Sequence, residues 1–379
     1  MRLTKAQHRF LDGTAAQRTS MRILLAVGEI SEAPRLVPIT SAHVSGASYK
    51  MIGDAGLEFL EDFARDARVV VPTTVNPLGT DLAQWRDLGI PPEFAENQER
   101  IARAYEQMGV APVYSCTPYL LGVRPALGEH VAWSESNAVC FANSVLGART
   151  NREGGPSALA SAVIGATPEY GLHVDESREP TVIAKLTTKP RGVDYSLIGL
   201  LVGERVGDGL PFFRGLPATE ADLKWLGAAL ASSGSCAMFH VEGITPEARK
   251  ARVRGLPSIT ITRADLTRVR REYSDGTDAE VIALGSPQLS TDELRDIALR
   301  VAVQPGGCSG LRYAMYLDDQ LSEKDVAEEQ FGVRIVIDKM SVPYLSEAKI
   351  DFVDSLEASG FTIDNPVATG SCACGHSFH

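Results

Sequence analysis

The sequence predicts a chain of two parts, an α/β part followed by a smaller β-rich (α+β) part. Before about residue 291, strand-like apolar runs alternate with amphipathic helices, which is typical of an α/β fold. After residue 300, short strands of alternating polarity follow one another. No linker rich in Gly, Ser or Pro separates the parts, and a helical stretch at residues 291–298 runs directly into the first of these strands. We therefore predict domains at residues 1–298 and 299–379.

The elements of the α/β part follow in order. An apolar run predicts a buried strand at residues 68–75, and apolar residues at helical spacing predict a helix at 96–108. A second strand is expected at 111–115. A helix is expected at 223–231 and a strand at 236–241.

The β-rich part carries strand patterns at residues 300–303, 311–316, 333–338 and 361–364. The segment 345–356 fits either a hairpin or a short helix, because its pattern is too short to separate the two.

Composition excludes several classes of protein. A length of 379 residues allows two or three domains, and a net charge of −11 argues against a nucleic-acid partner, which requires a basic face. The longest apolar run, residues 195–202, is far shorter than the ~18–20 residues that span a bilayer. The N-terminus carries Lys5, His8 and Arg9 with no apolar core after them, so no secretory signal is expected. Six cysteines are too few for a disulfide scaffold and indicate a reducing, cytoplasmic location.

Three cysteines near the C-terminus predict a soft-metal site. Cys308 lies in Gly-Gly-Cys-Ser-Gly, and Cys372 and Cys374 lie in Ser-Cys-Ala-Cys-Gly, where residues two apart on a strand face the same way. Thiolates favour an iron–sulfur cluster or zinc. A rival zinc set consists of Cys372, Cys374, His376 and His379, although its spacing is cramped for a tetrahedral site and leaves Cys308 unused.

The segment 299–379 resembles the A-type iron–sulfur carrier (HesB-like) family. The match begins with Leu-Arg-Val-Ala-Val-Gln-Pro-Gly-Gly-Cys-Ser-Gly-Leu-Arg-Tyr and ends with Ser-Cys-Ala-Cys-Gly-His-Ser-Phe. The resemblance implies a [2Fe-2S] or [4Fe-4S] cluster on Cys308, Cys372 and Cys374. Three thiolates are one short of a Cys₄ set, which favours a homodimer or release to apo iron–sulfur proteins. The N-terminal strand and helix of such carriers are not visible, so this domain is expected to be N-terminally truncated unless residues 291–298 replace the helix.

Residues 1–298 resemble the large, catalytic part of aconitase X. The matching stretches include Val-Pro-Thr-Thr-Val-Asn-Pro from residue 71, Cys-Thr-Pro-Tyr from 116, Trp-Ser-Glu-Ser-Asn from 133 and Phe-His-Val-Glu-Gly from 239. The resemblance implies an aconitase-like multi-layer α/β fold. It also implies dehydration of a small hydroxy acid, either cis-3-hydroxy-L-proline or mevalonate 5-phosphate.

Such a reaction needs a base for the C–H, an acid or metal for the departing hydroxyl and fixed donors for the carboxylate. The polar residues of the motifs are candidates for binding the substrate, although the amides and His43 could equally stabilise turns and Arg149 could pair with a carboxylate. No residue is assigned as the catalytic base. The predicted substrate-binding residues are His43, Ser45, Ser48, Asn76, Thr117, Asn137, Asn143, Arg149 and Asn151.

The aconitase X part departs from its family in two ways. Cluster-bearing relatives have Gly-Cys-Pro-His where this chain has Gly-Ser-Pro-Gln, so Ser286 replaces a thiolate and Cys116 is the remaining metal-ligand candidate, or else a buried thiol. Cys140 and Cys236 are expected to be core residues, and His173 and His240 to be structural. The small swivelling part of the family is not visible, which implies a separate small subunit.

Three interpretations follow from these observations. The chain is a dehydratase that carries its own iron–sulfur module, or a cluster carrier on a non-catalytic scaffold, or a truncated fusion in which neither activity is complete. Turnover separates the first from the second better than cluster binding does.

Overall fold

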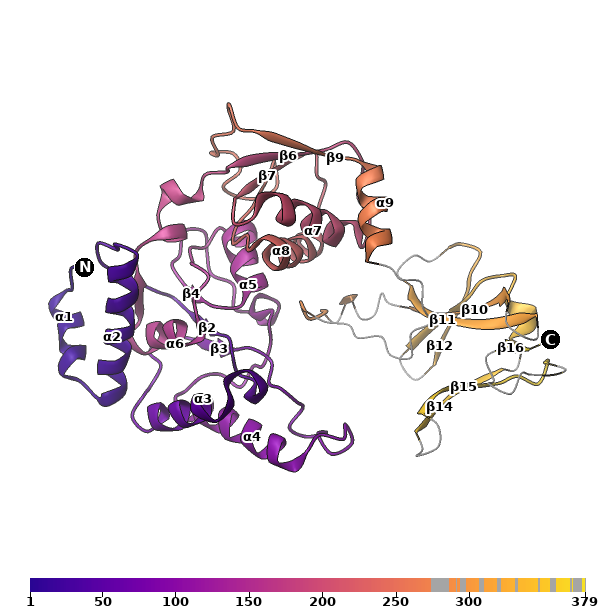
Figure 1. Ribbon diagram of the computed structural model, residues 1–379, viewed down its shortest axis with the longest axis horizontal. Coiled ribbons are helices and arrows are strands. Elements are labelled where there is room, and N and C mark those ends of the chain that lie inside the picture. The colour runs from indigo at the N-terminus through magenta and orange to yellow at the C-terminus, as the bar shows by residue number, and fades with distance from the viewer. Residues whose placement is uncertain are drawn as a thin grey trace. The chain divides into compact units, whose positions relative to one another are not determined.

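The computed structural model describes residues 1–273, 286–290, 292–293, 298–306, 310–318, 322–330, 333–346, 348–354, 359–368, 370 and 377–378. The chain forms two compact units (Figure 1). The first comprises Met1–Asp275 and Ser286–Gln288, and the second Gly276–Gly285 and Leu289–His379. The predicted boundary between residues 298 and 299 stays a prediction.

The first unit is a mixed α/β structure, as the sequence predicts. Its α-helices are α1 (Lys5–His8), α2 (Ala15–Ile30), α3 (Tyr49–Ala64), α4 (Pro92–Gln107), α5 (Ser136–Phe141), α6 (Gly155–Ile164), α7 (Asp194–Val206), α8 (Glu220–Gly234) and α9 (Arg263–Glu272). Its strands are β1 (Leu36–Pro38), β2 (Ala42–Val44), β3 (Thr73–Val75), β4 (Ala132–Trp133), β5 (Ala166–Pro168), β6 (Val182–Leu186), β7 (Pro211–Arg214), β8 (His240–Val241) and β9 (Ser258–Ile261). Short helical turns lie at Arg9–Asp12, Pro118–Leu121, Ala142–Leu146, Gly171–His173 and Asp175–Arg178.

Two parallel sheets organise this unit. The first has the order β3-β2-β4, the second has the order β8-β7-β6-β9, and β1 and β5 form a separate antiparallel pair. Helices α7 and α8 lie on one face of the second sheet (Figure 1). A Cβ added at Gly199 would lie 2.6 Å from the carbonyl oxygen of Leu226, so the two helices approach closely because glycine stands at the crossing.

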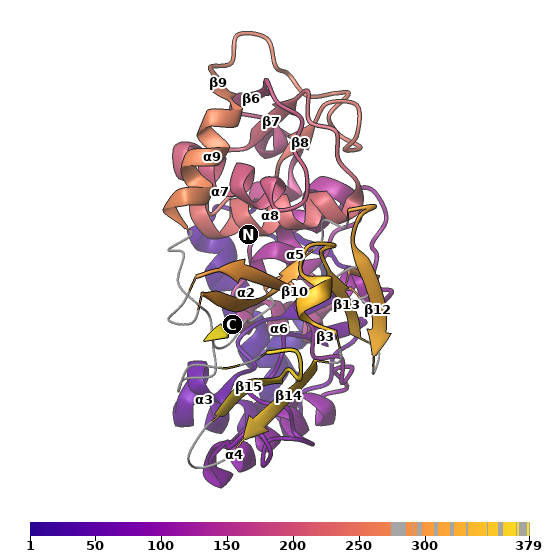
Figure 2. The same ribbon diagram turned by 90° about the vertical axis from the view of Figure 1, so that its right-hand side faces the viewer.

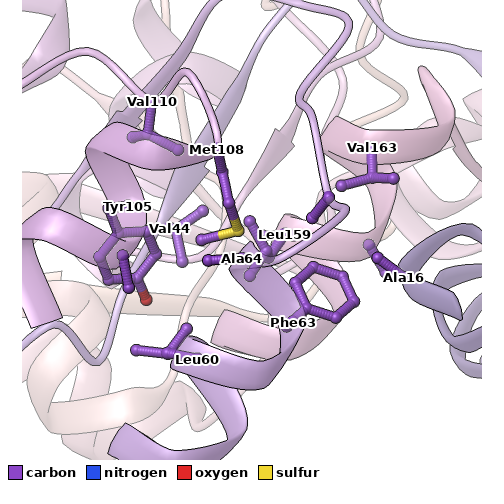
Figure 3. Close-up of a cluster of buried hydrophobic side chains, with 14 of the residues drawn as sticks. Ala16, Val44, Leu60, Phe63, Ala64, Tyr105, Met108, Val110, Leu159 and Val163 are labelled. Carbon is purple, nitrogen blue, oxygen red and sulfur yellow. The ribbon is translucent and has the colours of Figure 1, made fainter.

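The core beside the first sheet is built from α3, α4 and α6. Figure 3 shows Leu60, Phe63, Met108, Leu159 and Val163 gathered in one cluster. Met108 is fully buried at the end of α4. Burial of such side chains stabilises the fold by about 1.5–3 kcal/mol each.

The two predicted helices of this unit are confirmed. Residues 96–107 lie in α4 and Met108 caps its C-terminus, while the helix begins earlier because Pro92 occupies its first turn; residues 223–231 lie in α8. The three predicted strands are shorter than expected. Residues 68–75 form a strand only from Thr73, because the amides of Val69 and Val70 donate to the carbonyls of Met108 and Ala162 and not to a neighbouring strand.

Residues 111–115 form no strand but a single parallel bridge between Tyr114 and Val75. Residues 236–241 form a strand only at β8, because the Phe239 amide donates to the hydroxyl of Ser144 over 2.8 Å. The two corrections have different causes. The amides of Ala111 and Ser115 do donate to the carbonyls of Thr73 and Val75 in β3, but the Val113 amide donates to the Ala111 carbonyl and interrupts the ladder, whereas at Phe239 a side chain takes the hydrogen bond that a sheet would have used.

The second unit is β-rich, as predicted. Its strands are β10 (Ala298–Pro305), β11 (Leu311–Asp318), β12 (Val326–Gln330), β13 (Val333–Ile337), β14 (Lys349–Asp354), β15 (Ser359–Asp364) and β16 (Ser377–Phe378), with a 3-10 turn at Val342–Tyr344. One sheet has the order β12-β13-β10-β11-β16, and β14 pairs with β15 (Figure 2). All four predicted strands are confirmed. Within the segment 345–356, residues 349–354 form the single strand β14, which pairs antiparallel with β15 beyond the segment, so the described part favours the hairpin alternative over the helix.

The predicted helix at residues 291–298 is wrong at its end, because Ala298 begins β10 and pairs with Asp318; of the rest, only Asp292 and Glu293 are described, and both are helical. Cys308, Cys372, Cys374, His376 and His379 lie outside the described residues. Within the described part of the chain, no helix has the length and apolar character that crossing a membrane requires.

Candidate active site

The candidate site lies at the carboxyl ends of parallel strands in the first unit. Strands β2, β3 and β4 run parallel, and Tyr114 extends the set beyond β3. In open α/β sheets, ligands bind outside these strand ends. Ser45 follows β2 and Asn76 follows β3, while Glu135 comes two residues after β4 and Cys116 two residues after Tyr114. The strand ends therefore bring together residues up to 90 positions apart in the sequence.

Glu135 is the centre of a polar network. Asn76 Nδ2 donates to Glu135 Oε2 over 2.5 Å, and Asn137 Nδ2 donates to Oε1 over 3.1 Å. Ser136 Oγ also donates to Oε1, over 3.3 Å, and Tyr119 donates to Asn137 Oδ1 over 3.2 Å. Both carboxylate oxygens are therefore held by neutral donors, which fixes the orientation of the group.

His43 joins this network through a hydrogen bond to Asn76. Its ring is fully buried, with Nε2 2.8 Å from Asn76 Oδ1 and Nδ1 2.8 Å from Thr74 Oγ1. Because Asn76 donates its amide hydrogen to Glu135, its oxygen faces His43 and must accept a hydrogen from Nε2. Burial lowers the pKa of His43 to about 4, so the ring is neutral at pH 7. The chain Thr74–His43–Asn76–Glu135 therefore has one consistent direction of donation.

Asn137, which donates to Glu135, also hydrogen-bonds to the thiol of Cys116. Cys116 Sγ accepts the backbone hydrogen of Gln288 over 3.2 Å, and Ser115 Oγ donates to Gln288 Oε1 over 2.6 Å. The Thr117 amide donates to Ser115 Oγ over 3.1 Å. Burial, the largest effect, raises the pKa of the Cys116 thiol, while the hydrogen bonds from Gln288 and Asn137 lower it.

A pocket of about 410 Å³ opens beside Glu135. One wall is apolar and comes mainly from α3 and α6. The lining also includes the polar residues Ser45, Asn76, Glu135 and Arg152, and the guanidinium of Arg152 donates to the Ala231 carbonyl over 3.5 Å. A ligand with a hydrocarbon part and an anionic group matches this division.

The structure brings together five of the predicted substrate-binding residues, His43, Ser45, Asn76, Thr117 and Asn137, although only Ser45 and Asn76 line the pocket. Ser48 stands at the start of α3, and its Oγ lies 2.6 Å from where a Cβ at Gly79 would be.

The other three predicted residues are engaged by the protein elsewhere. Asn143 donates to the carbonyls of Thr150 and Ala237, and Asn151 donates to that of Tyr170. Arg149 donates to the His173 carbonyl and pairs with Asp175. Their predicted role in substrate binding stays a prediction.

Three residues of the site were not singled out from the sequence: Glu135, Arg152 and Gln288. The available signal for Glu135 was a carboxylate two residues after a short buried strand, inside a motif of the resemblance. Arg152 follows the same motif at its far end. Gln288 follows Ser286 in the altered Gly-Ser-Pro-Gln segment.

An iron–sulfur cluster does not fit the described donor set at Cys116. Cys140 and Cys236 are fully buried in an apolar core, as predicted, and His240 Nε2 donates to the Arg178 carbonyl over 2.8 Å. Among the described residues, no three His, Cys, Asp or Glu side chains could hold a metal ion. Cluster binding needs three or four ligands, and Cys116 supplies one.

The fold and the site define an α/β protein with a polar pocket at the carboxyl ends of parallel strands, followed by a β-rich unit. Residues 1–176 and 180–271 match the first and second domains of aconitase X, and residues 283–376 match the iron–sulphur cluster biosynthesis family. The chain belongs to the aconitase X family, as predicted, and its C-terminal part belongs to the iron–sulphur cluster biosynthesis family. These families associate the chain with an iron–sulfur cluster, whose type they do not specify.

Several relatives are dehydratases by name. The phosphomevalonate dehydratase large subunit of Methanothermobacter thermautotrophicus is 50% identical over 303 residues, which cover 78% of this chain and 76% of the relative. The cis-3-hydroxy-L-proline dehydratase of Hypocrea jecorina is 38% identical over 78% of this chain and 52% of its own length. The crystal structure of holo aconitase X from Thermococcus kodakaraensis superposes with a TM-score of 0.72 at 44% identity, covering 80% of this chain and 81% of that one.

Proposed function

We propose that the chain is the large subunit of a hydro-lyase that dehydrates a small anionic hydroxy acid. The observation that carries this proposal is the convergence of Glu135, Asn76, Ser45 and Arg152 on one pocket at the carboxyl ends of parallel strands. The same pocket offers a held carboxylate, an exposed cation and an apolar wall. Dehydration of a hydroxy acid needs a base, an anion-binding group and a surface that excludes water.

Mevalonate 5-phosphate is the preferred substrate and cis-3-hydroxy-L-proline the second. Relatives named phosphomevalonate dehydratase large subunit match at 50% and 46% identity and over 76% and 79% of their own length. Relatives named for hydroxyproline match at 38% and 39% identity and over only 52% and 51% of theirs. The words "large subunit" in the first group support a separate small subunit as the partner of this chain.

In the proposed mechanism, Arg152 binds the anionic end of the substrate through charge-assisted hydrogen bonds. Glu135 then removes a proton from the carbon next to the one that bears the hydroxyl, taking it on a carboxylate oxygen. The electron pair of the C–H bond forms the C=C bond as the C–O bond breaks, and the departing hydroxyl takes a proton from solvent and leaves as water. Asn76 and Asn137 hold that carboxylate in place, and neutral His43 holds Asn76. The apolar wall keeps water from the base. No step is assigned to a cluster, because the described residues around Cys116 do not supply its ligands.

The test is turnover of the purified chain with and without an aconitase X small subunit. Each of the two hydroxy acids is supplied in turn, and product is followed by proton NMR in deuterated buffer. We expect mevalonate 5-phosphate to lose its hydroxyl only when the small subunit is present. Absence of dehydration of both substrates in the presence of the small subunit would refute the hydro-lyase and support a scaffold or an incomplete fusion.

A second function, iron–sulfur cluster binding and transfer, is favoured by the C-terminal match. A Mycobacterium bovis protein is 55% identical over 101 residues, which make up 26% of this chain and 86% of that protein. We propose that Cys308, Cys372 and Cys374 hold a [2Fe-2S] or [4Fe-4S] cluster as cargo, shared between two copies of the chain or passed to apo-proteins in the cytoplasm. The proposed domain begins near residue 299.

Anaerobic reconstitution with iron and sulfide tests this second function. The triple variant Cys308→Ser, Cys372→Ser, Cys374→Ser should lose the cluster absorption and the Mössbauer signal, and Cys116→Ser should keep both. A cluster that survives the triple variant and disappears with Cys116→Ser would move the site to the first unit.

A further inference from the structure

One wall of the pocket is a short segment between two glycines with left-handed backbone. Gly46 has a φ of +81° and Gly53 a φ of +58°, and Gly53 interrupts α3 so that its first turn is separate from the rest. We call residues 47–52 the pocket flap. Within it, Met51 and Ile52 line the pocket. Both bounding glycines have positive φ angles, which residues with a side chain avoid. We therefore take Gly46 and Gly53 as the hinges of the flap.

The flap is fastened to α4 by one fully buried side chain, Gln98. Its Nε2 donates to the carbonyl of Ala47 over 2.8 Å, and its Oε1 accepts the amide of Tyr49 over 3.0 Å. The Tyr49 ring packs edge-to-face on Phe94 of the same helix, with the ring centroids 5.8 Å apart. These contacts hold the beginning of the flap, and at its pocket-facing end the amides of Met51 and Ile52 donate to the Ser48 carbonyl within the flap itself.

Gln98 also holds the neighbouring loop that carries Asn76. Its Oε1 accepts the amide of Gly79 over 2.8 Å, so one oxygen joins the segment after β2 to the segment after β3. A Cβ at Gly79 would lie 2.7 Å from this oxygen and 2.9 Å from the Phe94 ring, so the approach requires glycine. The two loops that supply Ser45 and Asn76 to the pocket are thus fixed by a single amide that does not itself touch the pocket.

The far end of the flap is fixed by packing. A Cβ built on Gly56 would lie 2.4 Å from the Cβ of Ile52, so Ile52 rests directly on the glycine backbone of α3. This position turns Ile52 into the pocket wall. Any side chain at residue 56 would push Ile52 away, because the atom it meets is Cβ and not the end of a flexible chain.

We propose that Gln98 is a positioning residue for substrate binding. It holds the pocket flap and the Asn76 loop in the arrangement in which Met51 and Ile52 enclose the hydrocarbon part of the substrate. The proposal rests on the proposed function for the identity of the ligand, but the fastening of the flap is a property of the first unit itself. Gln98 acts through the flap and makes no contact with the reacting atoms.

The test compares Gln98→Met with Gln107→Met in the full chain, because Gln107 lies on the same helix and is exposed. Loss of the three hydrogen bonds of Gln98 should speed amide exchange about 10- to 100-fold in peptides that cover residues 47–52 and 77–80. With the small subunit present, KM should rise about tenfold because the flap no longer encloses the substrate, and kcat should fall less than tenfold because Asn76 keeps its own hydrogen bonds to His43 and Glu135. Gln107→Met should behave as the wild type in both measurements.

Two further variants keep the test decisive. Gln98→Glu retains two acceptor contacts and should fold with intermediate exchange rates, and Gly56→Ala should raise KM by displacing Ile52 without faster exchange at residues 77–80. Unchanged exchange in Gln98→Met would overturn the proposal, as would faster exchange with an unchanged KM. A wild type with no turnover refutes the proposed function, whereas the exchange experiment still decides whether Gln98 holds the flap.

Discussion

Asn76 and Glu135 share a hydrogen bond of 2.5 Å between Nδ2 and Oε2, although the two residues are 59 positions apart in the sequence. Each follows a strand of the same parallel sheet, and their side chains meet because β2 separates the two strands by one position only. The bond gives Asn76 a fixed orientation, with its oxygen toward His43. The Glu135 carboxylate is therefore positioned by Asn76, which directly follows β3, and through it by His43, which lies in β2.

The first prediction concerns the base. Glu135→Gln should lower kcat by about 10²- to 10⁴-fold, because the amide cannot accept the substrate proton. The midpoint of thermal unfolding should fall only slightly, because the amide oxygen keeps the hydrogen bond from Asn76 while its NH2 group faces the Asn137 amide and loses one hydrogen bond. Steady-state kinetics with mevalonate 5-phosphate and the small subunit provide the measurement. Glu176→Gln, at an exposed residue, serves as the control, and a kcat within tenfold of wild type in Glu135→Gln would exclude Glu135 as the base.

The second prediction concerns His43. In a His43 variant, the amide of glutamine can occupy the position of the ring atom Nε2, which contacts Asn76. The shorter amide of asparagine can occupy only the position of Nδ1, which contacts Thr74. His43→Gln should therefore keep the donor to Asn76 and retain activity within about tenfold, while His43→Asn should keep only the contact with Thr74 and lose about 100-fold, as a misplaced catalytic group does.

The paired variants of His43 separate a positioning role from a packing role. Both substitutions remove the aromatic ring, so a loss of equal size in kcat would show that packing against Trp133, and not the hydrogen bond to Asn76, is what matters. The midpoint of thermal unfolding, measured for both variants, controls for global destabilisation.

The sequence predicts much of the local structure and several site residues. Helix α4 follows from apolar residues at helical spacing, and the strands β10, β11, β13 and β15 follow from alternation. His43, Asn76 and Asn137 are found because they stand in motifs beside short apolar runs. These features depend on residues that are close together in the sequence, so a single sequence is enough to predict them.

The rest depends on contacts between distant residues. Asn143, Arg149 and Asn151 share the motif that contains Glu135, yet they hydrogen-bond to residues 150, 237, 170 and 173. Gln98 is one polar residue in an amphipathic helix, and nothing in its neighbourhood separates it from the exposed Gln107. Its partners come from two loops that only the sheet brings together.

The third prediction concerns the anion-binding end of the pocket. Arg152→Met should raise KM for an anionic substrate about 10- to 100-fold, because charge-assisted hydrogen bonds contribute about 1.5–3 kcal/mol. The KM of Arg152→Lys should lie between that of the wild type and that of Arg152→Met, since lysine keeps the charge but not the planar guanidinium. Kinetics at fixed ionic strength provide the measurement. Arg271→Met, at an exposed residue of α9, is the matched control, and an unchanged KM in Arg152→Met would remove Arg152 from the site.

The fourth prediction concerns Arg178, whose side chain is 2% exposed. Its guanidinium pairs with Glu247 over 2.5 Å and donates to the carbonyls of Leu172 and Ala148 over 2.8 and 3.0 Å. Arg178→Met should lower the free energy of unfolding of the first unit by about 3–5 kcal/mol, because it leaves a carboxylate and two buried carbonyls unpaired.

Urea-induced unfolding followed by circular dichroism measures this loss. Arg103→Met breaks an exposed pair with Glu99 on α4 and should cost no more than about 0.5 kcal/mol. If the two variants lose similar stability, the buried hydrogen bonds of Arg178 contribute nothing beyond an exposed ion pair.

The fifth prediction concerns the second unit. Arg300 on β10 donates to both carboxylate oxygens of Asp325, over 3.0 and 2.6 Å, and this hydrogen bonding lowers the pKa of Asp325 from 3.8 to about 2. A carboxyl with a depressed pKa contributes stability that is fully present above its unfolded pKa and is lost as the pH falls toward the folded value. The contribution should therefore be constant above about pH 5 and disappear between about pH 4 and pH 2.

Differential scanning calorimetry of wild type and Asp325→Asn tests this dependence on pH. At pH 7 the second unit of the variant should unfold at a lower temperature than that of the wild type, and the difference should shrink as the pH falls from 4 to 2. Asp364→Asn, at an exposed residue of β15, should show no such convergence. A temperature difference between wild type and Asp325→Asn that is the same at pH 7 and pH 2 would mean that Asp325 is not stabilised as the charged partner of Arg300.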